Sequence, residues 1–156
     1  MTVADRNAAA GVVAMLLQGT VLDSIRAYSL VLQLGFVRLG SVEMLPSEVW
    51  VTLSRSLQVG RSSQIDDPGK QDFFSSRAAG LRDLYLLIGK SVTSATVQEN
   101  YVLNLVIDGQ TVAVSRDKEN LEEVWKVVSD GPECGVESRW AVTLDDAGEI
   151  SLRSPN

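Results

Sequence analysis

The chain has 156 residues, a net charge of −6 and 45% hydrophobic residues, which is the composition of one ordinary globular domain. It contains no histidine and a single cysteine, Cys134. Without histidine, Ser-His-Asp and Cys-His machinery, histidine zinc sites and histidine pH switches are excluded. A lone thiol cannot form an internal disulfide, and acidic neighbours make Cys134 a poor nucleophile.

The predicted elements alternate between helices and groups of strands. Apolar spacing predicts helices over residues 4–18 and 75–88, and a glycine ends each of them. Alternating apolar and polar residues predict strands over residues 21–27, 29–39, 50–53, 91–98, 101–107 and 110–115.

A third helix is expected over residues 117–129. Apolar residues between Leu121 and Val128 follow the i, i+3, i+4, i+7 spacing of one helix face. Asp117 can act as the N-cap, and Gly131-Pro132 would end the helix.

Two hairpins are predicted in the second half of the chain. Asp108-Gly109 separates two alternating stretches, and this dipeptide suits a type I′ turn because both central positions need positive φ. A second hairpin is expected where residues 140–144 and 149–152 flank the turn at residues 145–148.

Two parts of the chain share a pattern. Residues 9–11 read Ala-Ala-Gly and residues 16–19 read Leu-Leu-Gln-Gly, whereas residues 78–80 and 86–89 read Ala-Ala-Gly and Leu-Leu-Ile-Gly. We interpret this as an internal pseudo-repeat within one domain, residues 1–156. The halves span about residues 6–61 and 76–156, joined by a polar loop at 62–75.

Each half is predicted to contain a helix, a strand pair and a strand bearing tryptophan. Trp50 resembles both Trp125 and Trp140 in its surroundings, and the Trp140 match is preferred because the Trp125 segment is predicted to be helical. All three tryptophans are expected to pack in the core. The predicted class is α+β, with a mostly antiparallel sheet shared by the two halves.

The negative charge is concentrated in one segment. Residues 117–149 carry ten acidic and three basic residues, so this window nets −7 and the rest of the chain nets +1. Such a surface disfavours nucleic acid and anionic membranes, whereas it attracts a basic protein. A solvated face that only keeps the protein soluble is the alternative. The candidate partner-binding residues are Glu119, Glu122, Glu123, Asp145, Asp146 and Glu149.

Catalytic and phosphate-binding motifs are absent from the sequence. No G-x-x-x-x-G-K-[ST], G-x-G-x-x-G or G-x-S-x-G motif occurs. The pairs Asp66-Asp67 and Asp145-Asp146 offer oxygen ligands for a hard cation, but aspartate in such loops is typical of turns. We therefore predict no catalytic residue, cofactor or metal.

One half of the chain carries an extended motif. Leu87-x-Gly89-x-x-Val92 precedes L-x-L-x-I-D-G-x-x-V-x-V at residues 103–114. This pattern resembles small uncharacterised bacterial proteins, some of which are regarded as immunity proteins of polymorphic toxins. The resemblance covers about residues 84–144. In the first half Gly19 is present, but Leu22 replaces the valine and no Asp-Gly turn follows.

The absent catalytic motifs, the acidic segment and the resemblance together point to a non-enzymatic binding protein, with a basic toxin domain as the candidate partner. The single cysteine and the lack of a signal-peptide pattern predict a cytoplasmic location. Two alternatives stay open. One is a structural module, such as a homodimer formed through an exposed strand edge. The other is a protein that binds a small ligand or metal through carboxylates.

Overall fold

The computed structural model describes residues 2–3, 5–42, 44–54, 57–60, 73–114, 123–129 and 140–155. Its elements are β1 (Thr2–Val3), α1 (Arg6–Leu17), β2 (Thr20–Ala27), β3 (Leu32–Arg38), β4 (Glu48–Leu53), β5 (Leu57–Val59), α2 (Phe73–Tyr85), β6 (Val92–Val97), β7 (Leu103–Ile107), β8 (Gln110–Val114), β9 (Glu123–Ser129), β10 (Ala141–Asp145) and β11 (Ile150–Arg153). The predicted α+β class is confirmed, and all strand pairs are antiparallel.

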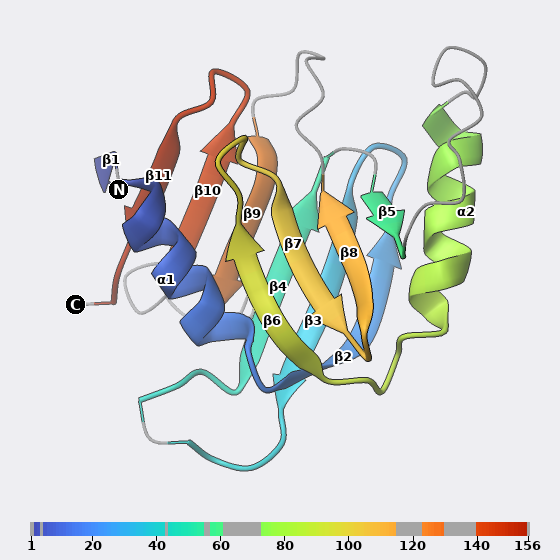
Figure 1. Cartoon of the computed structure of the whole chain (residues 1–156), viewed down its shortest axis with the longest axis horizontal. Coiled ribbons are helices and arrows are strands. Elements are labelled where there is room, and N and C mark those ends of the chain that lie inside the picture. The colour runs from blue at the N-terminus through green and yellow to red at the C-terminus, as the bar shows by residue number, and fades with distance from the viewer. Residues whose placement is uncertain are drawn as a thin grey trace.

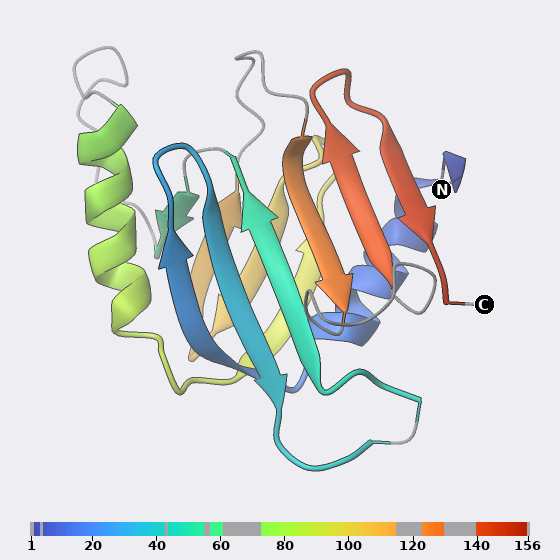
Figure 2. The same ribbon diagram turned by 180° about the vertical axis from the view of Figure 1, so that it is seen from behind.

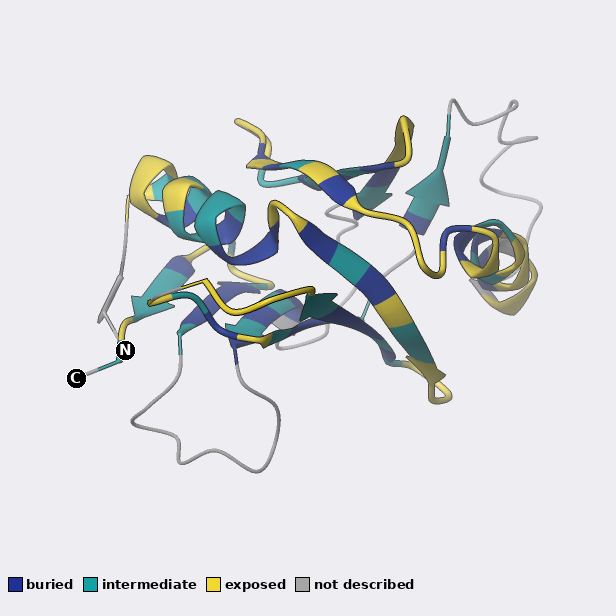
Figure 3. Cartoon of the chain, turned by 90° about the horizontal axis from the view of Figure 1, so that it is seen from below, coloured by how far each residue is buried: buried dark blue, intermediate teal, exposed yellow. Residues whose placement is uncertain are grey.

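The strands form two sheets that lie face to face (Figures 1 and 2). The larger sheet has the order β1-β11-β10-β9-β4-β3-β2, and the smaller has the order β5-β8-β7-β6. Helix α1 lies beside β6 and α2 lies beside β5, so each helix flanks one edge of the smaller sheet (Figure 3). The prediction of one shared sheet is therefore corrected, because each half contributes strands to both layers.

The predicted helix at residues 117–129 is wrong where the structure describes it. Residues Glu123–Ser129 form β9, in the middle of the larger sheet between β4 and β10. Three valines and a tryptophan in seven residues favour an extended strand, and pairing on both sides reinforces that preference. The helical spacing of the apolar residues was a coincidence of a short apolar run. Residues 117–122 lie outside the described parts.

The two glycine junctions of the predicted repeat pair with each other. The N–H of Gly19 donates to the carbonyl of Val92 at 2.9 Å, and the N–H of Gly89 donates to the carbonyl of Leu22 at 2.7 Å. Both glycines have positive φ, 76° and 82°. Because Leu22 and Val92 are also 70 residues apart, these two bonds are reciprocal and define a local two-fold arrangement. The division of the whole chain into two halves remains a prediction.

Turn chemistry sets the register of the smaller sheet. Asp108 and Gly109 have φ values of 50° and 76°, which confirms the predicted type I′ hairpin between β7 and β8. The turn between β6 and β7 contains Glu99 and Asn100, and its positive φ of 63° belongs to the following Tyr101. A three-residue hairpin loop that ends in a left-handed residue has this conformation.

The start and end of α1 are both anchored by side chains. Asp5 is the N-cap and accepts from the N–H of Asn7. At the other end, the guanidinium of Arg38 donates to the carbonyls of Leu16 and Gln18 at 2.9 and 3.0 Å. A cation on the last carbonyls of a helix satisfies orphan acceptors and complements the helix dipole. Arg38 therefore ties the end of β3 to the end of α1.

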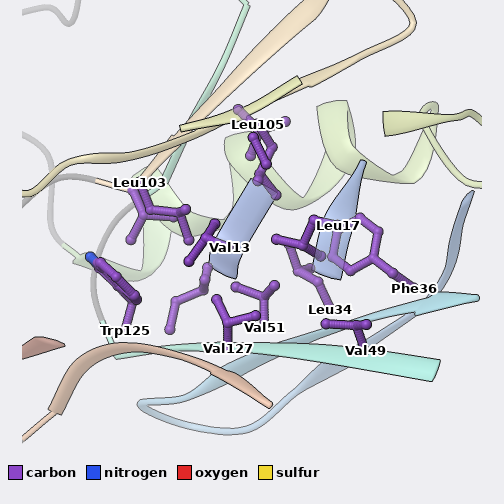
Figure 4. Packing of buried hydrophobic residues seen from close by; sticks show 14 of the residues in the cluster. Val13, Leu17, Leu34, Phe36, Val49, Val51, Leu103, Leu105, Trp125 and Val127 are labelled. Carbon is purple, nitrogen blue, oxygen red and sulfur yellow. The ribbon is translucent and has the colours of Figure 1, made fainter. Parts of the chain in front are cut away.

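The core lies between the two sheets and under α1 (Figure 4). Val13 and Leu17 of α1 meet alternate residues of strands from both layers. The labelled strand residues that share this core are Leu34, Phe36, Val49, Val51, Leu103, Leu105, Trp125 and Val127. All are less than 2% exposed, so strands of both layers bury their inner faces in one shared core.

Candidate functional site

Acidic residues from two strands and a turn meet at one end of the larger sheet. The register of β9 and β10 places Glu123 opposite Asp145, the first residue of β9 against the last of β10. Asp146 and Glu149 follow in the turn to β11 and are exposed. We call Glu123, Asp145, Asp146 and Glu149 the acidic end. The structure thus brings together four of the six candidate residues.

Glu119 and Glu122, the other two candidates, lie outside the described residues. Glu123 was expected on a helix face, and it lies instead on strand β9. The correction changes how the patch is built, because neighbouring residues of a strand point to opposite faces. Cross-strand pairing, rather than helical spacing, now accounts for the gathering of charge.

Asp145 has a structural role within the acidic end. Its carboxylate accepts from the N–H of Glu149 at 2.7 Å, and its own N–H donates to the carbonyl of Glu149 at 3.1 Å. The turn closes at Gly148, whose φ is 84°. The presence of aspartate at position 145 is therefore explained by the hydrogen bonds that it makes in this turn. Asp146 and Glu149 are both exposed.

One further acidic residue belongs near this end and was missed by sequence reasoning. The indole Nε1 of Trp125 donates to the carbonyl of Tyr101 at 3.0 Å, which holds the β6–β7 turn against the start of β9. Glu99 is exposed in that turn. The contact joins segments distant in the chain and belonging to different sheets. A count of charges along the sequence could not reveal this contact between the two sheets.

Other chemistry was sought among the described residues. They contain no group of three or more histidine, cysteine, aspartate or glutamate residues that could hold a metal ion. None of the described helices is long and apolar enough to cross a membrane. Cys134, Asp66 and Asp67 lie outside the described parts.

The three tryptophans occupy different environments. Trp125 is 1% exposed and lies between the sheets, and Trp140 packs against the core from a half-buried position. Trp50 lies on the opposite face of the larger sheet from Val49 and Val51, which are in the core. The core-packing prediction thus holds for Trp125 and in part for Trp140, whereas Trp50 belongs to the outer face.

The outer-face position of Trp50 is built from several contacts. The guanidinium carbon of Arg26 lies 4.2 Å from the indole ring centre, and Nε1 donates to Glu48 at 2.8 Å. Beneath the ring is Gly35, where an added Cβ would lie 2.9 Å from Trp50. Only glycine leaves room for the indole at that point. Trp50 is 8% exposed, so it is a packed feature of the sheet and not an open binding platform.

The edges of both sheets are protected in different ways. Helix α1 packs on β6 and α2 on β5, while β1 has only two residues. The long edge strand β2 carries a bulge near Asp23 and an exposed Arg26. Short strands, bulges and charges are the usual means of preventing edge-to-edge association. These features give little support to a homodimer formed by strand pairing alone.

Helix α2 is anchored by a buried arginine. Arg77 is 6% exposed, and its guanidinium donates to the carbonyls of Ser29 and Val31 at 2.8 and 2.6 Å. Desolvation by burial lowers the pKa of Arg77 from its ordinary value, although arginine stays protonated in proteins. The contact fixes α2 beside the β2–β3 turn. The exposed Tyr28 and Leu30 lie on that turn.

The apolar spacing that predicts the second helix comes from Leu81, Leu84, Tyr85 and Ile88, and these residues enter the core only in part. Leu84 is fully buried and Leu81 is partly buried, whereas Tyr85 is 71% exposed and Ile88 is 37% exposed. The helix ends at Tyr85, and residues 86–89 form turns. The spacing correctly predicted a helix, but it did not distinguish its buried side from its exposed apolar side.

Comparison of the chain with family models, with curated proteins and with solved structures finds no match.

Proposed function

We propose that this chain is a non-enzymatic protein-binding protein whose acidic end contacts a basic partner. The observation that carries the proposal is the β9–β10 register, which puts Glu123 and Asp145 beside the exposed Asp146 and Glu149. Carboxylates gathered on one end raise the association rate of a positively charged protein and repel nucleic acid.

The partner class we propose is a bacterial toxin domain, with the chain acting as its cytoplasmic immunity protein. The support for it is the acidic surface and the resemblance of residues 84–144 to immunity-associated proteins. A basic cleft that binds nucleic acid would accept the acidic end in place of a phosphate backbone. Occupying that cleft would block the toxin without any chemistry by the inhibitor.

The test measures binding of the full chain to the purified protein encoded by the neighbouring gene, by calorimetry at low and high salt. In the first variant, Asp146→Asn and Glu149→Gln remove two exposed charges and leave the Asp145 turn bonds intact. We expect the Kd to rise at least about tenfold at low salt, with a smaller salt dependence.

A matched control removes two charges elsewhere. Asp23→Asn and Asp83→Asn alter an exposed residue of β2 and a partly exposed one of α2, and the Kd should change less than about twofold because screening weakens charges beyond a Debye length. Equal losses in both variants would mean that only net charge matters. An unchanged Kd in the first variant removes the acidic end from the proposal, and absence of any binding removes the toxin as partner.

A further inference from the structure

Most of the buried polar side chains in the described parts of the chain have a hydrogen-bond partner. Thr20 Oγ1 donates to a helix carbonyl at 2.6 Å, Arg77 donates to the β2–β3 turn, and Ser129 Oγ accepts from a backbone N–H at 2.9 Å. Thr143 on β10 is the exception, because it is 6% exposed and its Oγ1 has no partner there. A buried hydroxyl without a partner is costly, and a bound water or ion is a usual reason that a native structure keeps one.

A second unpartnered polar atom lies on the neighbouring strand. Nε of Arg153 on β11 is also buried and without a hydrogen-bond partner within the described structure. No salt bridge joins its guanidinium to a carboxylate of the described residues. Arginine stays charged in proteins, so this side chain keeps N–H donors and a positive charge that need a counterpart. Two donors on adjacent strands therefore share the same need for an acceptor.

The strand register places both residues on the outer face of the larger sheet, where β9, β10 and β11 lie side by side (Figure 2). Trp50 on that face is opposite Val128, which in turn is opposite Ala141. Thr143, two residues after Ala141, shares its face, and Arg153 is the direct neighbour of Ala141 on β11. Diagonal residues on neighbouring strands are about 7–8 Å apart, which is within reach of a long side chain. The arginine and the threonine can therefore serve one ligand.

Two further polar side chains flank Thr143. Lys126 on β9 and Ser151 on β11 are its direct cross-strand neighbours, and both are partly exposed. Lys126 has a contact of its own, so it contributes charge rather than a free donor. Asp145 follows on β10, but its carboxylate already accepts from the N–H of Glu149. We call this group the outer-face cluster: Lys126, Thr143, Ser151 and Arg153.

From this arrangement we propose that the outer-face cluster binds an oxyanion, the phosphate or carboxylate group of a ligand. The anion oxygens accept from the guanidinium of Arg153 and from the hydroxyls of Thr143 and Ser151. A guanidinium matches the spacing of such oxygens, and hydrogen bonds between charged groups are stronger than neutral ones. Arg153 and Ser151 are partly exposed, so the anion enters past them. Rotation of the flexible arginine side chain then brings the hydroxyl of Thr143 into contact with it.

The charges of the cluster favour an anion over other occupants. A water molecule would satisfy the hydroxyl of Thr143, but it would leave the charge of Arg153 without a counterpart. A divalent cation would be repelled by Lys126 and Arg153, and it prefers carboxylate or carbonyl ligands. The net charge of the chain is −6, so anions are repelled at long range and the affinity depends on these local donors. We therefore expect weak, reversible binding of a simple anion.

The test is titration of the full chain with inorganic phosphate, with acetate and with chloride at one ionic strength, followed by two-dimensional NMR. We expect saturable shifts of the Arg153 Nε–H and of the amides of residues 143 and 151, with a Kd on the order of 1–10 mM for phosphate or acetate. The tighter of these two anions identifies the group that the ligand carries. A chloride response of the same size, or shifts that do not saturate, would overturn the proposal.

The most informative variant is Thr143→Val, which keeps the shape of the side chain and removes its hydroxyl. The Kd for the anion should rise at least about fivefold, and without the anion the Tm should not fall, because an unpartnered buried hydroxyl is removed. Thr52→Val is the matched control, since Thr52 is the neighbour of Lys126 on its other side, and anion binding should persist. Equal losses in both variants would contradict a site at Thr143.

A second variant separates the guanidinium from its charge and guards against misfolding. Arg153→Lys keeps the positive charge on a partly exposed residue, so circular dichroism should show an unchanged fold, whereas the Kd should rise at least about tenfold. Phosphate at about ten times its Kd should raise the Tm of the wild-type chain by about 3–5 °C and should have little effect on either variant. Binding that survives both Thr143→Val and Arg153→Lys would mean an adventitious ion only.

The outer-face cluster and the acidic end can fail independently. Thr143→Val should leave the affinity for the neighbouring-gene protein unchanged, because it alters no charge. The variant lacking the Asp146 and Glu149 charges should bind phosphate within about twofold of the wild-type chain. A much larger gain in that variant would show that anions respond to net charge and not to the cluster, and this outcome would also overturn the proposal.

Discussion

Leu16 and Leu86 occupy the same place in the repeated Leu-Leu-x-Gly pattern, yet Leu16 is fully buried and Leu86 is 72% exposed. Leu16 lies inside α1, whose last carbonyls are bound by Arg38. Leu86 lies in the turn after α2, which has already ended at Tyr85. The glycines that follow, Gly19 and Gly89, donate reciprocally to the carbonyls of Val92 and Leu22. The repeated pattern therefore specifies the junction, whereas the surrounding tertiary structure decides how far the helix continues and what it covers.

The largest expected effect separates the two leucines. Leu16→Ala should lower the free energy of unfolding by about 3 kcal/mol, because it removes a fully buried side chain and leaves a cavity. Leu86→Ala should change it by less than about 0.5 kcal/mol, because most of that side chain is already in water. Urea denaturation of both variants measures the difference.

Leu17 and Leu87 provide the internal control for this comparison. Both are buried, at 0% and 5% exposure, so alanine at either position should be costly. Similar stabilities of Leu16→Ala and Leu86→Ala would contradict the different burial of the two positions. A small loss in Leu87→Ala would show that the second junction packs less firmly than the first.

A smaller effect should be nearly equal in the two halves. Gly19→Ala and Gly89→Ala each place a side chain at a positive φ, which costs about 1–2 kcal/mol. Neither site is crowded: the added Cβ would lie 3.5 Å from Arg38 at Gly19 and would meet nothing within 4 Å at Gly89. The cost therefore comes from backbone conformation alone, and thermal or urea unfolding should show losses of similar size.

Asparagine is the matched substitution at these two glycines. It adopts the left-handed region more readily than alanine, so Gly19→Asn and Gly89→Asn should regain part of the lost stability. If alanine and asparagine were equally harmful, contacts rather than φ would be responsible. If only one glycine were sensitive, the two junctions would not be equivalent in energy.

Much of the fold could be predicted because local signals agreed with the final structure. Gly19 lies just after the end of α1, Asp108-Gly109 made the expected hairpin, and alternating residues formed β6 and β7, whereas α2 ends at Tyr85, before the predicted stop at Gly89. The assignment failed at Glu123–Ser129, where a helical pattern and a strand pattern fit the same short apolar run. Pairing with β4 and β10 decided that case. This pairing joins segments far apart in sequence, so no local window could contain it.

The candidate site was predicted less well than the fold. Asp145, Asp146 and Glu149 lie within five residues of sequence, and their grouping required only the hairpin. Their meeting with Glu123 depended on the β9–β10 register, and the approach of the Glu99 turn depended on the Trp125–Tyr101 bond. The exposed side of α2 depended on how far the fold covers that helix. These features are decided by packing between elements and not by spacing within one.

The smallest expected effect concerns the glycines of the two Ala-Ala-Gly triplets. Gly11 lies on an exposed position of α1, and an added Cβ would meet nothing within 4 Å. Gly11→Ala should raise the free energy of unfolding by about 0.5–1 kcal/mol, since alanine loses less backbone entropy in a helix. Gly80 lies in α2 against Leu57, where the Cβ would be 3.2 Å from a backbone oxygen and 3.3 Å from the side chain.

The same helix-propensity gain at Gly80 should be cancelled by this crowding. Backbone oxygen cannot move aside as a flexible side chain can, so Gly80→Ala should be about 1 kcal/mol less stable than Gly11→Ala. The difference corresponds to a Tm gap of about 2–4 °C for a domain of this size. Equal stabilisation by both substitutions would mean that α2 can shift away from β5 at little cost. The anchoring of α2 would then rest on Arg77 rather than on close packing at Gly80.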